Sequence, residues 1–245
     1  MKISAIVLAG GKGSRMNSDI QKQYLLLCGK PVLYYALQAF QHSSVEEIIL
    51  VVGTGMVQNI SEEEYCKKEF IDNCHFNKIK HIVMGGSERY DSVMNGLAAI
   101  HNDVDYILIH DGARPCITAE LIERCIQDVI DCKACVAAVP VKDTIKVVDS
   151  KNYAVSTPDR STLWQIQTPQ CFEYNMIWKA YHNMAADTDK SNITDDAMVV
   201  EKYSDNKVKM TYSSYKNIKI TTSEDLQIAK TFLFDKLLED KTSVK

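Results

Sequence analysis

Short apolar runs alternate with amphipathic segments through the first part of the chain. Apolar runs bounded by turn residues are typical of strands buried on both faces. Such strands are expected at Ile3–Ala9, Glu47–Val52, Lys78–Met84, Tyr106–Ile109 and Val136–Val141. Helices are expected at Pro31–Leu37, Arg89–His101 and Ala119–Ile130, and an acidic, helix-permissive and solvated surface segment at Gln58–Asn73. Strands that alternate with helices predict a mostly parallel sheet covered on both faces.

The pattern changes between Lys142 and Arg160, where few residues are of core type. Two short extended runs around a turn predict a hairpin, and a hairpin this exposed usually packs on something else. It is either an arm that projects toward a second subunit or a hairpin at the sheet edge. Further elements are expected at Leu163–Phe172, in helices at Tyr174–Ala185, Thr194–Tyr203 and from Glu224, and in strands at Lys207–Thr211 and Ile218–Thr221.

A glycine loop follows the first expected strand. Gly10, Gly11 and Gly13 leave room for a sharp turn or for close approach of a ligand, and Arg15 and Lys22 add positive charge. Backbone N–H groups in such a loop can hold phosphate oxygens, although glycines alone are also found in ordinary strand-to-helix turns. Neither a P-loop nor a dinucleotide-binding fingerprint fits the spacing. A nucleoside triphosphate therefore suits the loop better than a dinucleotide.

Two more polar turns follow expected strands, at Gly85–Arg89 and His110–Arg114. Because parallel sheets bind ligands at the carboxyl ends of their strands, these turns should converge with the glycine loop. Asp111 could hold a substrate hydroxyl or a Mg²⁺-bound water, and Arg114 a phosphate or a neighbouring acid; alternatively, the two brace a tight turn. Gly86–Ser92 could contact a base edge or cap a helix.

Composition narrows the function further. A net charge of −4 gives no basic field for a nucleic-acid partner, and no run of about 18 apolar residues predicts a membrane span. We therefore expect a cytoplasmic protein. The eight cysteines do not indicate a disulfide scaffold, and Cys132 and Cys135 fit small buried hydrophobes. The sequence shows no pattern of a nucleophilic triad or of zinc ligands. The remaining candidates for function are the glycines and cations, which can bind phosphates.

Several segments together resemble one family. They are, in order, LAGGKGSRM with KQY, GGSERYDSV, HDGARP, VPVKDTIK, LWQIQTPQ, ITDDA and NIKITTSEDL. In this order and spacing they resemble the 2-C-methyl-D-erythritol 4-phosphate cytidylyltransferases of the non-mevalonate isoprenoid pathway, from Ile3 to about Leu233. The resemblance implies a single Rossmann-like nucleotidyltransferase domain at 1–235, a β-arm at about 142–160 that joins two subunits, and a C-terminal tail at 236–245. It also implies transfer of CMP from CTP to methylerythritol phosphate, with Mg²⁺ and release of pyrophosphate.

The resemblance assigns roles residue by residue. Catalytic cations at the α-phosphorus would be Arg15, Lys22 and Lys219. Nucleotide-binding positions would be Ala9, Gly10, Gly11, Gly13, Gly86, Ser87, Ser92 and Gly112. Substrate-side positions would be Asp111, Arg114, Thr168 and Thr194, together with Thr144 and Arg160 of the partner subunit. Mg²⁺ would be held mainly through the CTP phosphates, with Asp111 as a candidate ligand.

Two departures leave alternatives open. The loop reads Leu8-Ala9-Gly10-Gly11 where the family often has Pro-Ala-Ala-Gly, and this form also occurs in ribitol-5-phosphate cytidylyltransferases. Ser87 replaces an acid found in some relatives. The same chemistry on ribitol 5-phosphate or another polyol phosphate is therefore the second interpretation. A nucleotide-binding module without catalysis is the third, and three cations near one phosphorus argue against it.

Overall fold

The computed structural model describes residues 1–11, 20–100, 103–190 and 192–242, with side chains described as far as Phe234. Within these ranges, a seven-stranded sheet has the order β13-β9-β12-β8-β1-β4-β7. Its strands are β1 (Ile3–Ala9), β4 (Glu47–Val52), β7 (Ile79–Met84), β8 (Tyr106–Asp111), β9 (Ala134–Pro140), β12 (Trp164–Glu173) and β13 (Lys209–Tyr212). Only β12 runs antiparallel to its neighbours, β8 and β9. The prediction of a mostly parallel α/β sheet is confirmed.

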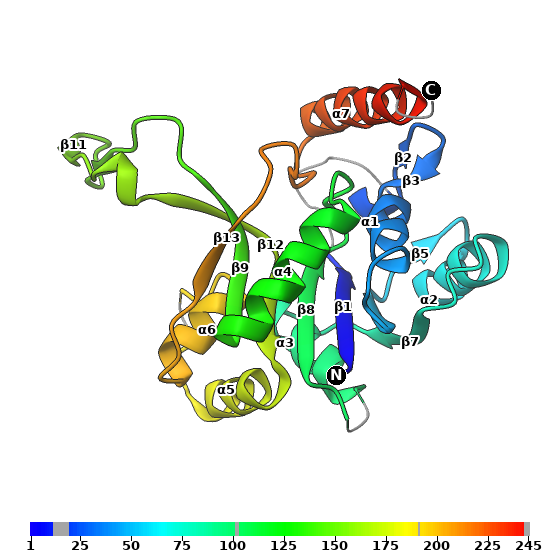
Figure 1. The fold of residues 1–245 in the computed structure, drawn as a ribbon, viewed down its shortest axis with the longest axis horizontal. Helices are drawn as coiled ribbons and strands as arrows, with labels where there is room; N and C mark the ends of the chain where they lie inside the picture. The colour runs from blue at the N-terminus through cyan, green and yellow to red at the C-terminus, as the bar shows by residue number, and fades with distance from the viewer. Residues whose placement is uncertain (12–19, 101–102, 191, 243–245) are drawn as a thin grey trace.

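Helices cover both faces of this sheet, because strand side chains point alternately to opposite sides. On β1, Ala5 and Val7 belong to one apolar cluster and Ile6 to the other. The first cluster packs under α1 (Val32–Gln41) and α4 (Ala119–Cys132), which lie in front of the sheet in Figure 1. The second packs under α3 (Arg89–Ala98), α5 (Tyr174–Ala186) and α6 (Asp196–Tyr203). The near-continuous apolar strands thus fit a sheet buried on both faces.

The strand register brings the polar turns to one edge. Ala9 pairs with Val52 and Leu8 with Asp111, so β1, β4 and β8 end side by side. Backbone hydrogen bonds continue past the strand ends: Gly85 N–H donates to Val52 O at 2.7 Å, and Gly112 N–H donates to Leu8 O at 2.8 Å. The convergence expected from the sequence is therefore confirmed.

The hairpin between residues 142 and 160 projects from the body. β10 (Val147–Val148) and β11 (Ala154–Ser156) form a separate two-stranded antiparallel sheet, and Figure 1 shows them extending to the upper left, away from the seven strands. Val148, Tyr153 and Val155 are more than half exposed. A hairpin at the edge of the main sheet is therefore the wrong alternative, and a projecting arm is what the chain forms.

The segment at Gln58–Asn73 differs from the sequence prediction. After the short strand β5 (Met56–Val57), it contains β6 (Ile60–Ser61), α2 (Glu62–Cys66) and a π-helical turn, η3 (Lys67–Asn73). Its apolar residues pack into the core beneath α1, and Glu62 is only 2% exposed. The prediction of a solvated surface segment was wrong because the acidic residues conceal a helical apolar face at Tyr65, Cys66 and Phe70.

Element ends also differ in places. Pro31 precedes α1 and belongs to the small hairpin of β2 (Leu26–Leu27) and β3 (Lys30–Pro31). The helix expected from Thr194 begins two residues later, at Asp196, and Asp195 caps it. The expected strand at Ile218–Thr221 is instead an extended segment whose Ile220 N–H donates to Ala113 O. This segment leads into α7 (Ser223–Thr242), which reaches into the expected C-terminal tail. No helix within the described ranges is long and apolar enough to cross a membrane.

Candidate active site

A cavity of about 670 Å³ opens at the carboxyl edge of β1, β4, β7 and β8. Glycines, hydroxyls and charged side chains line it. Among the residues expected at the site, the lining includes Gly10, Gly11, Lys22, Gly86, Ser87, Ser92, Asp111 and Lys219. These come from five separate parts of the chain. The fold therefore gathers most of the predicted nucleotide-binding and catalytic residues that it describes.

Other predicted residues take different places. Arg15 and Gly13 lie outside the described residues. Ala9, Gly112, Arg114 and Thr168 are buried behind the lining. Thr144 and Arg160 are exposed on the arm, where the Arg160 guanidinium donates to Lys142 O at 2.9 Å, and Thr194 is exposed just before α6. None of the described arm residues lines the cavity of this chain.

Asp111 is the electrostatic centre of the cavity floor. Its carboxylate lies 2.9 Å from Lys219 Nζ and 3.6 Å from both Arg89 Nε and Arg114 Nε. Burial alone would raise the pKa of this carboxyl, but the three cations outweigh burial and hold the pKa well below its usual range. Asp111 is therefore ionised at any physiological pH. The nearby Arg114 and two side chains from distant parts of the chain, Arg89 and Lys219, surround its carboxylate.

Arg114 and Thr168 support Asp111 from behind. Arg114 is 9% exposed, and its Nη1 donates to Asn217 O at 2.8 Å. The Thr168 hydroxyl accepts a hydrogen bond from Asp111 N–H at 3.1 Å. Of the two partners expected for Arg114, the neighbouring acid is the one it contacts. Both residues thus hold the end of β8 in place.

Arg89 lines the cavity and was not among the predicted site residues. Its guanidinium forms a bidentate pair with Asp196, at 2.8 and 2.7 Å, and Asp196 is completely buried. The Tyr181 hydroxyl also donates to Asp196, at 2.5 Å. The two charges outweigh the cost of burying the guanidinium, so Asp196 and Asp111 raise the pKa of Arg89. A helix start at Arg89 was visible in the sequence, but its partner is 107 residues away.

The turn before α3 caps that helix and also faces the cavity. Glu88 N–H donates to Asp91 Oδ2 at 3.1 Å, and Gly86 N–H donates to Ser92 Oγ at 3.0 Å. A Cβ atom on Gly86 would lie 2.2 Å from the Asp91 side chain, so only glycine fits there. The helix-cap interpretation is confirmed, and the same turn presents Gly86, Ser87 and Ser92 to the cavity.

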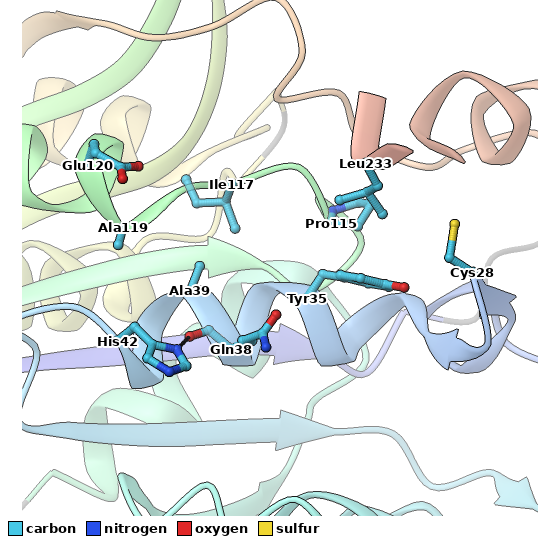
Figure 2. A pocket seen from close by; sticks show the side chains of 10 residues that line it. All are labelled: Cys28, Tyr35, Gln38, Ala39, His42, Pro115, Ile117, Ala119, Glu120 and Leu233. Atoms are coloured by element: carbon cyan, nitrogen blue, oxygen red, sulfur yellow. Dashed lines mark hydrogen bonds between the residues drawn. The ribbon is translucent and has the colours of Figure 1, made fainter. Parts of the chain in front are cut away.

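A second cavity, of about 370 Å³, lies between α1, the start of α4 and α7 (Figure 2). Side chains of Tyr35, Ala39, Ile117 and Leu233 give it apolar walls. The residues labelled in Figure 2 include one carboxylate, Glu120, and no lysine or arginine. Of these two cavities, only the one beside Asp111 has the cations that a triphosphate requires.

The cysteines differ in burial: Cys28 is exposed, whereas Cys66, Cys125, Cys135 and Cys171 are buried. All eight are free thiols, and the C-x-x-C pair points to backbone oxygens: Cys132 Sγ donates to Ala134 O and Cys135 Sγ to Cys125 O. Cys135 is completely buried. The burial of Cys135 fits a small hydrophobe, and the packing role of the pair stays a prediction.

His110 makes folding stability depend on pH. Burial, with smaller effects from Arg114 and Lys219, lowers the pKa of His110 to about 3 against the opposing charge of Asp111. From pH 6.5 down to about 3 the unfolded chain binds a proton that the folded chain does not. This residue should therefore cost about 1.4 kcal/mol of unfolding free energy for each pH unit that the pH falls within that window.

Urea unfolding at about pH 7 and about pH 5 checks this expectation. His110→Gln keeps a hydrogen-bonding side chain but does not titrate, so its stability should fall less on acidification than that of the natural chain. Equal losses in the two proteins would show that His110 is protonated in the folded state.

The sheet and its cationic edge define the class: this is an α/β nucleotidyltransferase. The family model for 2-C-methyl-D-erythritol 4-phosphate cytidylyltransferase matches residues 3–235. The enzyme of that name from Lachnospira eligens is 52% identical over 94% of this chain and 98% of its own length. The one from Lachnoclostridium phytofermentans is 48% identical over 95% of this chain and 96% of its own length. The chain belongs to the 2-C-methyl-D-erythritol 4-phosphate cytidylyltransferase family.

A solved structure agrees with this assignment. The crystal structure of 4-diphosphocytidyl-2C-methyl-D-erythritol synthase from Anaerococcus prevotii superimposes with a TM-score of 0.78 at 33% identity. It covers 95% of this chain and 96% of that protein.

Proposed function

We propose that this enzyme transfers CMP from CTP to 2-C-methyl-D-erythritol 4-phosphate and releases pyrophosphate. The observation that carries the proposal is the cavity where Lys22, Arg89 and Lys219 meet the glycine turns at the carboxyl edge of the sheet. Cations and backbone N–H groups stabilise phosphate oxygens, and they act most strongly where charge develops. Membership of the family supports the choice of both substrates.

The proposed reaction is an in-line displacement at the α-phosphorus of CTP. An oxygen of the acceptor phosphate forms the new P–O bond while the bond to the pyrophosphate oxygen breaks. A phosphate monoester is already anionic at neutral pH, so no general base is needed. The barrier arises from bringing two polyanions together and from charge on the transferred group. We assign this stabilisation to Lys22 and Lys219, together with Arg15.

Two turns of the lining, at Gly10–Gly11 and at Gly86–Ser92, would bind different parts of the nucleotide. We assign the triphosphate to the backbone around Gly10 and Gly11, and the cytidine to the turn at Gly86–Ser92. An added Cβ on Gly11 would have no atom within 4 Å, so the fold itself does not require glycine there. A ligand that approaches the backbone would account for it.

Magnesium is proposed as the cofactor, carried by the CTP phosphates. In the part of the chain that the structure describes, no group of three or more His, Cys, Asp or Glu side chains could hold a metal ion. Asp111 and Glu88 are the carboxylates in the described lining, and Lys219, Arg89 and Arg114 already balance the charge of Asp111. This donor set does not fit a protein-held Mg²⁺, which commonly keeps waters and substrate phosphates as ligands. The residues therefore act on the phosphates directly.

The acceptor would lie on the Asp111 side of the cavity. We infer that Arg114 and Thr168 contribute to acceptor binding indirectly, by holding Asp111 in place. Thr194, two residues before the first residue of α6, stays a predicted substrate-side residue. The arm carries Thr144 and Arg160 away from their own cavity, so we propose a homodimer in which Thr144 and Arg160 of the partner subunit complete the site.

The dimer has a direct test. The apolar, exposed arm residues Val148, Tyr153 and Val155 would be covered by the second subunit. Sedimentation equilibrium should give twice the chain mass of 27.6 kDa. A chain mass that stays at 27.6 kDa at assay concentrations would contradict the shared site. A cytoplasmic location remains a prediction.

Lys22→Ala should lower kcat by about 10²- to 10³-fold, while the Kd for CTP rises much less. The reason is that a cation at the α-phosphorus acts chiefly on the charge of the transition state. Steady-state kinetics and calorimetric titration with CTP measure the two effects separately. Lys30→Ala, at an exposed lysine outside the cavity, is the control. Near-normal turnover of Lys22→Ala would show that Lys22 has no catalytic role.

The function itself is tested by pyrophosphate release from CTP with methylerythritol phosphate and ribitol 5-phosphate in parallel. Rapid release with the first acceptor is expected. Release with ribitol 5-phosphate alone would change the substrate, and release with neither would favour a nucleotide-binding module.

A further inference from the structure

Glu62 is a buried carboxylate with no place in the reaction described so far. It is the first residue of α2, in the segment that its acidic sequence predicts to be a solvated surface. Glu63 and Glu64 beside it are exposed, but Glu62 turns inward. A buried carboxylate is costly unless hydrogen bonds satisfy it, so its partners identify what it stabilises.

Four donors surround the Glu62 carboxylate. Its Oε2 accepts from the Tyr24 hydroxyl at 2.8 Å and from Gly53 N–H at 2.9 Å. Its Oε1 accepts from Gln21 Nε2 at 2.9 Å and from Gly55 N–H at 3.1 Å. A carboxylate offers only acceptors, and bonds to a charged acceptor are stronger than neutral ones. The side chain therefore joins two loops that are otherwise separate in the chain.

Both loops carry residues of the cavity wall. Lys22 lies between Gln21 and Tyr24, and Thr54 lies between the two glycines that Glu62 holds. These glycines approach the carboxylate closely: a Cβ on Gly53 would lie 2.9 Å from Glu62 Oε1, and one on Gly55 would lie 2.6 Å from it. The backbone at Gly53–Gly55 is thus shaped around this one side chain.

Burial keeps two neighbouring groups protonated, the Tyr24 hydroxyl and the Cys66 thiol. Burial, with smaller effects from Cys66 and Glu62, raises the pKa of Tyr24 well above its usual range. Burial also raises the pKa of Cys66 to about 12. The Tyr24 hydroxyl therefore remains a donor to Glu62 across the whole working pH range.

We propose that Glu62 is a positioning residue for cytidylyl transfer: it holds Lys22 and Thr54 in register on the same wall of the nucleotide cavity. This inference rests on the proposed function, because it acts through the role given to Lys22. Glu62 does not touch the reacting groups. A shift of about 1 Å in a catalytic group can cost about 10²-fold in rate. A carboxylate that fixes the positions of two cavity loops can therefore change the reaction rate strongly without touching the substrate.

Glu62→Gln is the informative substitution, because glutamine keeps the volume and one acceptor but turns an NH₂ group toward two donors. We expect kcat to fall by about 10- to 100-fold and the Kd for Mg²⁺–CTP to rise, while KM for the acceptor phosphate stays within about twofold. Glu63→Gln, on the neighbouring exposed residue, should leave all three values unchanged. Circular dichroism and urea unfolding establish that each variant is folded under assay conditions.

A double variant separates positioning from general destabilisation. If Glu62 acts through Lys22, then Glu62→Gln added to Lys22→Ala should slow the reaction little further, because the cation it positions is gone. Multiplying effects, or a Glu62→Gln enzyme as fast as Glu63→Gln, would overturn the inference.

The proposed function can fail separately. Failure of the natural chain to release pyrophosphate would refute the transfer reaction, whereas the Kd for Mg²⁺–CTP of Glu62→Gln against Glu63→Gln would still decide the role of Glu62. Equal affinities in those two variants would then overturn it.

Discussion

Replacing Lys219 with methionine should lower kcat by about 10²- to 10³-fold, the loss expected when one preorganised charge is removed from a transition state. Lys219 lines the cavity, and its ammonium lies 2.9 Å from Asp111. Methionine keeps an apolar stem of similar length, so packing changes little. The Asp111 carboxylate keeps Arg89 and Arg114 as neighbours, so its ionisation should survive.

Steady-state kinetics with both substrates varied measures this loss. Lys216→Met is the matched control: this lysine lies three positions earlier on the same segment, is exposed, and contacts the Phe232 ring outside the cavity. Turnover of Lys219→Met within a few-fold of Lys216→Met would show that Lys219 only neutralises Asp111.

Asp196→Ala should reduce the free energy of unfolding by about 3–5 kcal/mol, the usual cost of removing one partner from a buried ion pair. The substitution leaves the Arg89 guanidinium without its bidentate acceptor and the Tyr181 hydroxyl without its own. Arg89 would then be held by Asp111 alone, at 3.6 Å. Because Arg89 lines the cavity, activity should fall as well, even at temperatures where the variant is folded.

Urea unfolding measures the loss, and Glu201→Gln on the exposed side of the same helix serves as the control. The double variant Arg89→Met/Asp196→Leu removes both charges. It should be more stable than Asp196→Ala, because no buried charge is left unpaired. A double variant that is less stable than the single one would show that packing, not charge, dominates the site.

The parts of the fold that the sequence predicts well are those with local causes. Strands such as β4 are apolar from Ile48 to Val52, and a run of this kind is typically buried between layers of helices. Turns such as Gly85–Arg89 follow directly after strands, and the parallel arrangement places them at one edge. Both features depend on residues within a few positions of one another, so both can be seen in the sequence.

Other residues take their roles from distant contacts. Glu62 stands among exposed glutamates, and only the loops at Gln21 and Gly53 distinguish it. Arg114 is buried, and its guanidinium donates to Asn217 O, 103 residues further along the chain. Such partners lie from nine to more than a hundred residues apart, and no local pattern marks them.

By itself, the amino-acid sequence determined a mostly parallel α/β sheet, a set of polar turns at its carboxyl edge and, through motifs in fixed order, the family. Hydrophobic periodicity and turn residues depend on residues close together in the chain, so they can be recognised without knowledge of the fold. The tertiary structure decided which charges meet: Asp111 with three cations, Arg89 with Asp196, and Glu62 with two loops. Electrostatic and hydrogen-bond energies depend on distance in space, and only folding sets those distances.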